Sequence, residues 1–167
     1  DAKAAAVVSK GQLSLLRANL GSGGGQSQVK GSASISTSTI ASVRLSSGST
    51  TAITDTTITG SFETAGTTTL DRSALAGTGV GTGLVLTGGT VAVRGSTITG
   101  FQKGLSVSGG AATLSQTTVA DNAQGVVVTG GSASLVGTIV SHTSTGVDCT
   151  GPVASSGWNL VSDTSCA

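Results

Sequence analysis

The chain is poor in the residues that form an aromatic core or a charged surface. Its 167 residues include no Met, no Tyr and one each of Trp, Pro and His, and 9% of them are charged. The formal net charge of +1 gives no sign of the basic surface that binds nucleic acid or an anionic membrane. No apolar run reaches the roughly 18 to 20 residues that span a bilayer. We therefore expect no nucleic-acid partner and no membrane insertion of this segment.

The absence of methionine and the scarcity of cysteine bear on the origin of the chain. It starts at Asp1, which suggests that a leader was removed or that the sequence is a fragment of a longer protein. Cys149 and Cys166 are too few for a zinc site of Cys and His pairs. We expect them to form one disulfide in an oxidising compartment. Two unpaired thiols in a cytosolic protein are the alternative.

Glycine and small polar residues are abundant, and they recur with a fixed period. The glycine pairs at 88, 109 and 130, followed by Gly151-Pro152, are spaced 21 residues apart. A period near 20 indicates stacked units. Three apolar columns keep this period: Leu84, Leu105, Val126 and Val147; Val93, Leu114 and Leu135; and Ile98, Val119 and Ile139, the last with a slip of one residue. Three columns predict three short strands in each turn of a solenoid.

The columns continue upstream with looser spacing, as turns of variable length allow. The second column extends back through Leu13, Ile35, Ile53 and Leu70, and the third through Ile40, Ile58 and Leu75. Apolar positions alternate with Ser, Thr or Ala, which is the period of a half-buried strand. We predict an all-β fold, a single-stranded parallel β-helix of about eight coils of roughly 21 residues, right-handed by the crossover preference.

The chain is expected to form a single domain with two capped ends, because open solenoid ends expose strand edges. Residues 1–12 would be an N-terminal cap or first strand, 13–148 the coils, and 149–167 a C-terminal cap. Cys149 falls on the core column of Leu86, Val107 and Val128. A bond to Cys166 would fold the last segment, with Trp158, across the open coil and stabilise the fold by about 3 kcal/mol.

The last repeats carry the most specific motifs, namely Thr-Ile-Val at 138–140, Asp-Cys-Thr-Gly at 148–151, Ser-Gly-Trp-Asn-Leu at 156–160 and Asp-Thr-Ser-Cys at 163–166. From residue 88 to 166 the chain resembles right-handed parallel β-helix repeat proteins of the pectin-lyase-like superfamily, in the style of bacterial autotransporter passengers and adhesins. The resemblance implies a bacterial-type secreted protein. Some members cleave acidic polysaccharides and others are adhesins or fibre domains, so the fold does not select the function.

The ionisable residues provide little for catalysis. The only concentration of charge is Asp55, Asp71, Arg72 and Arg94. The columns place Asp71 beside Arg94 and Asp55 beside Arg72, which favours a surface salt-bridge ladder worth at most about 1 kcal/mol per pair over a catalytic cluster. His142 has no Cys or carboxylate at ligand spacing and is interpreted as a solvated turn residue. We predict no catalytic site, no metal site and no cofactor.

Threonines beside the third column suggest a different kind of surface. They are Thr57, Thr59, Thr97, Thr99, Thr118 and Thr138. Pointing outward, they would form a flat face similar to those of ice-binding proteins, although Ala and Val interrupt the rows. A plain exposed strand face is the alternative, because Thr is common in strands.

These features favour a non-enzymatic extracellular or cell-surface module with a structural or adhesive role. It would assemble with itself, end to end or laterally into filaments, or bind host or cell-surface ligands as part of a larger protein. An exposed solenoid surface with few charges offers little repulsion to such packing. A carbohydrate-binding or carbohydrate-cleaving β-helix is the first alternative, and an ice-binding protein using the Thr-rich face is the second.

Overall fold

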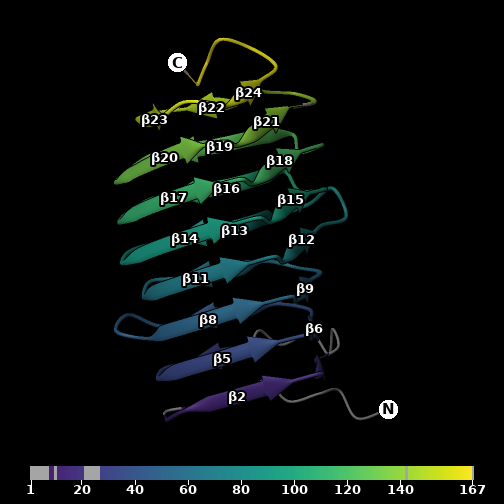
Figure 1. Cartoon of the computed structure of the whole chain (residues 1–167), viewed down its shortest axis with the longest axis vertical. Helices are drawn as coiled ribbons and strands as arrows, with labels where there is room; N and C mark the ends of the chain where they lie inside the picture. Colours follow the sequence, from purple (N-terminus) through teal and green to yellow (C-terminus); the bar gives the residue numbers. More distant parts are fainter. Residues whose placement is uncertain (1–7, 10, 21–26, 142, 167) are drawn as a thin grey trace.

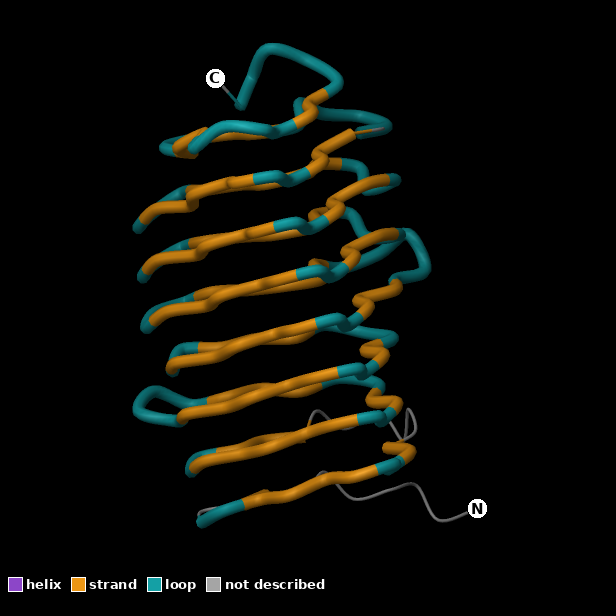
Figure 2. The backbone as a smooth tube through the Cα atoms, viewed as in Figure 1, coloured by secondary structure: helices purple, strands orange, loops and turns teal. Residues whose placement is uncertain are grey.

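The computed structural model describes residues 8–9, 11–20, 27–141 and 143–166. These residues form a solenoid of three parallel β-sheets without a helix, and each sheet contains eight strands (Figure 1). The coils stack along the long axis of the molecule, with strands joined by turns at three corners (Figure 2). The predicted all-β parallel solenoid is confirmed. We name its sheets A, B and C in the order in which the chain visits them.

Successive coils contribute one strand to each sheet. Sheet A contains β1 (Val8–Ser9), β4 (Ser27–Val29), β7 (Val43–Leu45), β10 (Phe62–Thr64), β13 (Thr82–Leu86), β16 (Lys103–Val107), β19 (Gln124–Val128) and β22 (Cys149–Thr150). Sheet B contains β2 (Leu13–Leu16), β5 (Ser32–Ser36), β8 (Thr50–Thr54), β11 (Thr67–Asp71), β14 (Thr90–Arg94), β17 (Ala111–Ser115), β20 (Ser132–Val136) and β23 (Val153–Ser155). Sheet C contains β3 (Asn19–Leu20), β6 (Thr39–Ile40), β9 (Thr57–Ile58), β12 (Ala74–Ala76), β15 (Thr97–Thr99), β18 (Thr118–Ala120), β21 (Ile139–Ser141) and β24 (Leu160–Val161).

The core fills the interior of the solenoid with aliphatic side chains stacked in register. The main column of sheet B comprises Ile35, Ile53, Leu70, Val93, Leu114 and Leu135. All six are buried. Outward Ser, Thr and Ala residues alternate with them, because successive side chains of a strand point to opposite faces. The central part of the predicted column is confirmed.

Two predicted column positions at the ends are wrong. Leu15 rather than Leu13 lies opposite Ile35, since Leu13 pairs with Ala33. In sheet C, Val140 follows Val119 in register. Ile139 points outward and is 38% exposed. The slip of one residue in the third column therefore does not exist, and the 21-residue spacing runs on from residue 119 to residue 140.

The predicted alignment of the last coil is also wrong. Cys149 pairs with Val126 and not with Val128. Val147, placed in this column by the period, is instead 47% exposed. The cause is the connection between β21 and β22, which is longer than the corresponding connection between β18 and β19. A fixed period locates core residues only while the turns keep their length.

The glycine pairs turn the chain from sheet A into sheet B. Gly89, Gly110 and Gly131 have φ angles of 71°, 83° and 82°, a region that L side chains rarely adopt. A Cβ atom on Gly110 would lie 2.3 Å from the Gly89 carbonyl oxygen, and one on Gly131 would lie 2.2 Å from that of Gly110. Stacked turns approach so closely here that only glycine fits.

A left-handed residue marks the corner between sheets B and C in every coil. The φ angles there lie between 45° and 60°, and the residues are Arg17, Thr37, Asp55, Arg72, Gly95, Gln116, Gly137 and Trp158. We call this row the corner column. In seven of the eight coils the next residue carries a Ser, Thr or Asn side chain, namely Ser38, Thr56, Ser73, Ser96, Thr117, Thr138 and Asn159.

These polar side chains replace backbone partners that the bend would leave unpaired. The Ser73 hydroxyl donates to the Asp71 carbonyl oxygen at 2.8 Å and accepts the Thr56 N–H at 3.1 Å. Ser96 repeats the arrangement one coil later by accepting the Ser73 N–H at 3.0 Å. Buried backbone groups are costly without a partner. The hydroxyls therefore let sheets B and C meet at a sharp corner without leaving these backbone groups unpaired.

Thr37 is the only β-branched residue in the corner column, and a β-branched side chain is strained at positive φ. We expect Thr37→Asn to raise the free energy of unfolding by about 1 kcal/mol, because Asn tolerates this conformation. Urea denaturation followed by circular dichroism measures the change. Thr39→Asn, in β6, is the control and should not stabilise. A Thr37→Asn variant less stable than the unmodified protein would contradict the interpretation.

Candidate functional site

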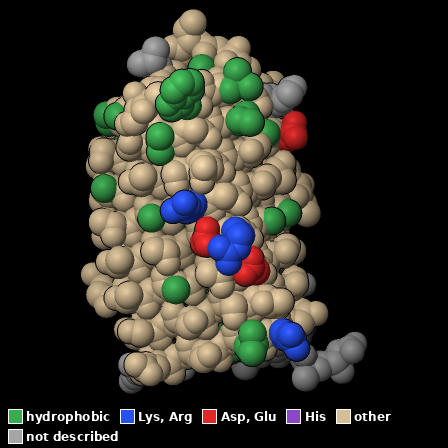
Figure 3. Space-filling view, in the orientation of Figure 1, with side chains coloured by type: hydrophobic (Ala, Val, Ile, Leu, Met, Phe, Trp, Pro, Cys, Tyr) green, Lys and Arg blue, Asp and Glu red, His purple; other side chains and the backbone are tan. Residues whose placement is uncertain are grey.

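The charged residues predicted to form a ladder gather at the corner between sheets B and C. Arg72 binds the Asp55 carboxylate with two nitrogens, Nε to Oδ1 at 2.9 Å and Nη2 to Oδ2 at 3.0 Å. Its Nη1 binds Asp71. Figure 3 shows acidic and basic side chains side by side on this face. The predicted contact between Asp55 and Arg72 on adjacent coils is confirmed.

The second predicted rung of this ladder is not formed. Asp71 and Arg94 are neighbours in register, yet among the described residues Asp71 forms its ion pair with Arg72. A further pair, missed in the sequence, joins Arg44 to Glu63 at 3.0 Å on the outer face of sheet A. Arg44 and Glu63 lie opposite each other in β7 and β10. Aligning the apolar columns of the sequence would have been enough to predict this register.

The ion pair holds its groups in their charged forms. The hydrogen bond from Arg72 lowers the pKa of Asp55, and the hydrogen bond to Asp55 raises the pKa of Arg72. A general acid or base works best with a pKa near the operating pH. Both shifts move the pKa further from neutral pH, as expected for a surface salt bridge.

Trp158 ends the corner column on the outside of the molecule. The prediction that it lies across the open coil is wrong, because its side chain is 92% exposed. It borders a shallow pocket of about 460 Å³ lined by Arg94, Ser115, Gln116, Val136, Gly137 and Trp158. Figure 3 shows hydrophobic side chains gathered toward this end of the face. The indole of Trp158 therefore does not contribute to the core.

The Thr-rich face expected on sheet C is less regular than its sequence suggests. Thr97 and Thr118 lie on adjacent coils, but Ala74 separates Thr97 from Thr57, and Ile139 follows Thr118. Thr59 is exposed, and Thr99 is half-buried. Thr138 does not belong to this face. Its hydroxyl is buried and donates to the Leu114 and Val136 carbonyl oxygens at 3.1 and 3.2 Å.

Part of the outer face of sheet B is uncharged, a feature that the predictions from the sequence did not include. Two of its outward columns contain only Ser, Thr and Ala, namely Ser32, Thr50, Thr67, Thr90, Ala111 and Ser132, and Ser14, Ser34, Ala52, Thr69, Ala92, Thr113, Ser134 and Ala154. The signal was present, because these residues alternate with the core column. The third outward column carries Leu16, Asp71, Arg94 and Val136, so only these two columns lack charges and long side chains and are open to close packing.

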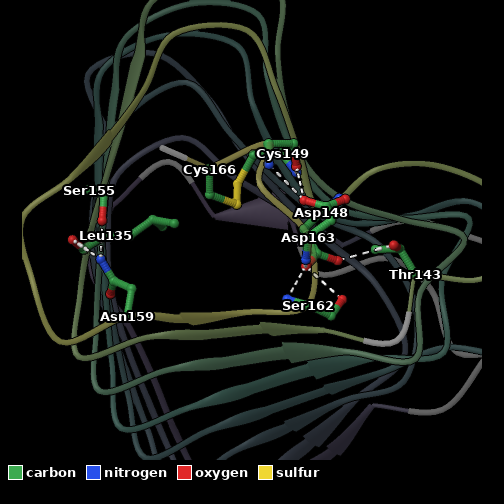
Figure 4. The surroundings of a disulfide bond; sticks show 10 residues. Leu135, Thr143, Asp148, Cys149, Ser155, Asn159, Ser162, Asp163 and Cys166 are labelled. Carbon is green, nitrogen blue, oxygen red and sulfur yellow. Dashed lines mark hydrogen bonds between the residues drawn. A yellow bond between two sulfur atoms is a disulfide. The ribbon is translucent and has the colours of Figure 1, made fainter.

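The predicted disulfide closes the C-terminal end. Cys149 is bonded to Cys166 across 17 residues of sequence. The segment between them is not all cap, because β22, β23 and β24 still continue the three sheets. The cap proper is residues 162–166, which cross the end of the solenoid (Figure 4). The predicted boundary at residue 149 therefore lies too early.

Two carboxylates hold the cap in place. Asp148 is buried and accepts the Ser162 N–H at 2.6 Å, the Ser162 hydroxyl at 2.7 Å and the Thr143 hydroxyl at 3.1 Å (Figure 4). Asp163 in turn accepts the Asp148 N–H at 2.9 Å. The Ser165 hydroxyl accepts the Cys149 N–H at 2.8 Å. Side-chain oxygens thus occupy the place of backbone acceptors that another coil would supply to sheet A.

The remaining polar residues of interest either lie outside the described residues or have a structural role. His142 lies outside the described residues. Within the described ranges no group of three or more His, Cys, Asp or Glu is placed to hold a metal ion. Asn122, beside Asp121, is buried and accepts the Phe101 N–H at 2.9 Å, a corner role like that of Ser73. No described helix has the length and hydrophobicity to cross a membrane.

Comparison with known proteins does not extend this description. Neither a scan against protein-family models, nor a search of curated proteins, nor a search of solved structures found a match. The function is therefore inferred from the geometry of this chain.

The cap should weaken in acid because of Asp163. The Ser165 hydroxyl, followed by the Asp148 and Ser165 N–H groups, lowers the pKa of Asp163 below 3.8. Its stabilisation is therefore complete above its unfolded pKa of about 3.9 and is lost as the pH falls through the lower folded value. We expect Asp163→Asn to lower the melting temperature most near pH 7 and to have little effect near pH 2, as measured by calorimetry.

Asp121→Asn is the matched control, because Asp121 is exposed and lies outside the cap. Its effect should be small and nearly independent of pH. A melting-temperature loss in Asp163→Asn that stayed constant from pH 7 to pH 2 would show that the Asp163 charge does not hold the cap.

Proposed function

We propose that this chain is a non-enzymatic extracellular module with a structural or adhesive role, acting as a rigid spacer that associates with itself. The observation that carries the proposal is the continuity of the three sheets. Neighbouring coils are joined by parallel strand pairs in all three sheets, so bending the rod would break hydrogen bonds on every side. Eight strands per sheet at roughly 4.8 Å make a body about 35 Å long.

The use of the ionisable groups supports a structural role. Arg72 forms ion pairs with both Asp55 and Asp71 at the surface. Asp148 and Asp163 hold the cap. Much of the remaining surface consists of small uncharged residues, as in two of the outward columns of sheet B. Such a surface can pack against another protein surface but has few groups that could take part in catalysis.

The disulfide supports an extracellular location. A bond between Cys149 and Cys166 persists in oxidising compartments and is rare where glutathione keeps thiols reduced. It stabilises the end of the rod, where fraying of the last coil would begin.

Sedimentation velocity over a concentration series tests the proposal, with electron microscopy of the concentrated samples. We expect species larger than the monomer to grow with concentration, and regular fibres at the upper end. High salt should have little effect, because few charges are available to be screened. A monomer at every concentration would contradict self-association.

A further inference from the structure

The C-terminal end is closed over sheet A but not over sheet B. In sheet A, the Cys149 N–H of β22 is paired by Ser165, and the disulfide lies beside it. In sheet B, β23 pairs with β20 alone among the described residues. Exposed strand edges of this kind are templates for another chain. The asymmetry therefore excludes sheet A as the place where a partner strand can join. Sheet C, where β24 pairs with β21 alone among the described residues, has the same kind of edge as sheet B.

The free edge of β23 has a defined set of donors and acceptors. Ser156 donates to the Leu135 carbonyl oxygen at 2.8 Å, and Pro152 accepts the Ala133 N–H at 3.4 Å. Because alternate residues of a parallel strand bond to opposite neighbours, the backbone groups of Val153 and Ser155 face away from β20. The Val153 N–H turns back to Gly151 at 2.9 Å. The Val153 carbonyl and both Ser155 backbone groups are left facing the C-terminal end.

The other end of sheet B carries the complementary edge. Among the described residues β2 pairs with β5 alone. The Arg17 N–H donates to the Ser36 carbonyl oxygen at 3.2 Å, so the odd-numbered residues of β2 bond to β5. By the same alternation, the backbone groups of Ser14 and Leu16 face the N-terminal end. The two ends of sheet B can therefore pair as two successive coils do.

The side chains of the two edges are also complementary. The inward positions of β23 are small or open, with Val153 half-buried and Ser155 exposed. Those of β2 are large, with Leu13 and Leu15 only half-buried. Leu13 and Leu15 have no further coil to pack against at the N-terminal end. In contact with the C-terminal end of a second copy, they would pack over Val153 and Ser155, and this burial is favourable.

We propose that β23 of one copy pairs with β2 of a second copy, so that sheet B continues from molecule to molecule. The register is Val153 with Leu13, Ala154 with Ser14 and Ser155 with Leu15, which keeps the core columns in line. Arg17 of the second copy would then follow Trp158 in the corner column, where a guanidinium can stack on the exposed indole. The contact explains why Trp158 and Leu16 are 92% and 67% exposed.

This pairing uses different surfaces on the two copies, so it leaves a free edge at each end and produces an open filament. The cap over sheet A directs the contact to the other two sheets, and the complementary side chains of β23 and β2 place it on sheet B and its corner with sheet C. The inference rests on the self-association proposed above and names the surfaces that carry it.

Disulfide trapping tests the register directly. Ser14→Cys with Ala154→Cys places thiols in the same outward column of sheet B, one at each end. Oxidation should link molecules head to tail, visible as a ladder of oligomers on a non-reducing gel. Ser14→Cys with Thr113→Cys is the control, because Thr113 lies in the same column within the sheet. The control should give at least roughly tenfold less product.

A charge at the edge tests the same contact without a crosslink. Ser155→Lys directs an ammonium into the position where Leu15 of the partner would pack, and such inward charges block edge pairing. We expect roughly a tenfold or greater weakening of association in sedimentation velocity. Thr113→Lys adds the same charge to the middle of the face and should leave association unchanged. Circular dichroism checks that both variants are folded.

The outcomes separate this inference from the broader proposal. Equal crosslinking by both cysteine pairs, or association unaffected by Ser155→Lys, would overturn the β23 to β2 contact and leave self-association through another surface. A strictly monomeric unmodified protein would overturn both. If Ser155→Lys does not fold, the cysteine pairs decide alone.

Discussion

Hydrogen bonding along the axis is the constraint on which the rest of this solenoid depends. In each coil, alternate residues direct their N–H and C=O groups to the coil before and the coil after. No coil is complete by itself, and the turns must bring every strand into register with its neighbours. The positive φ angles of Gly89, Gly110 and Gly131 and the close stacking of their carbonyls follow from this demand.

The same constraint explains how the polar residues are used. Backbone groups at the bend from sheet B to sheet C lose their strand partners, and Ser73, Ser96 and Asn159 provide substitutes one coil after another. At the C-terminal end Asp163 and Ser165 do the same for sheet A. Most of the buried polar chemistry therefore maintains the ladder. What remains for other molecules is the surface of small residues, the exposed Trp158 and the edges of sheets B and C that have no neighbouring strand among the described residues.

The two ends of the molecule are chemically different, and this difference directs the functional argument. The C-terminal end combines a covalently fixed cap with an open strand in sheet B, whereas β2 at the other end displays leucines that lack a complete layer. An end closed on all sides would act as a terminator. An end closed over sheet A limits addition to the edges of the other two sheets, and a low-charge surface does not oppose it.

The sequence alone determined the architecture, because a 21-residue period with three alternating apolar columns is compatible with stacked strands and with little else. Ile53, Leu70, Val93 and Leu114 were placed correctly for this reason. The pairing of Cys149 with Cys166 followed from there being only two cysteines. Only the tertiary structure decided the register of the last coil, where a longer turn moved Cys149 opposite Val126. Only the tertiary structure showed that Thr138 is buried, Trp158 exposed and Asp71 bonded to Arg72. Period and alternation specify a side chain's face within a strand, whereas turn length and corner geometry depend on contacts between coils that are distant in sequence.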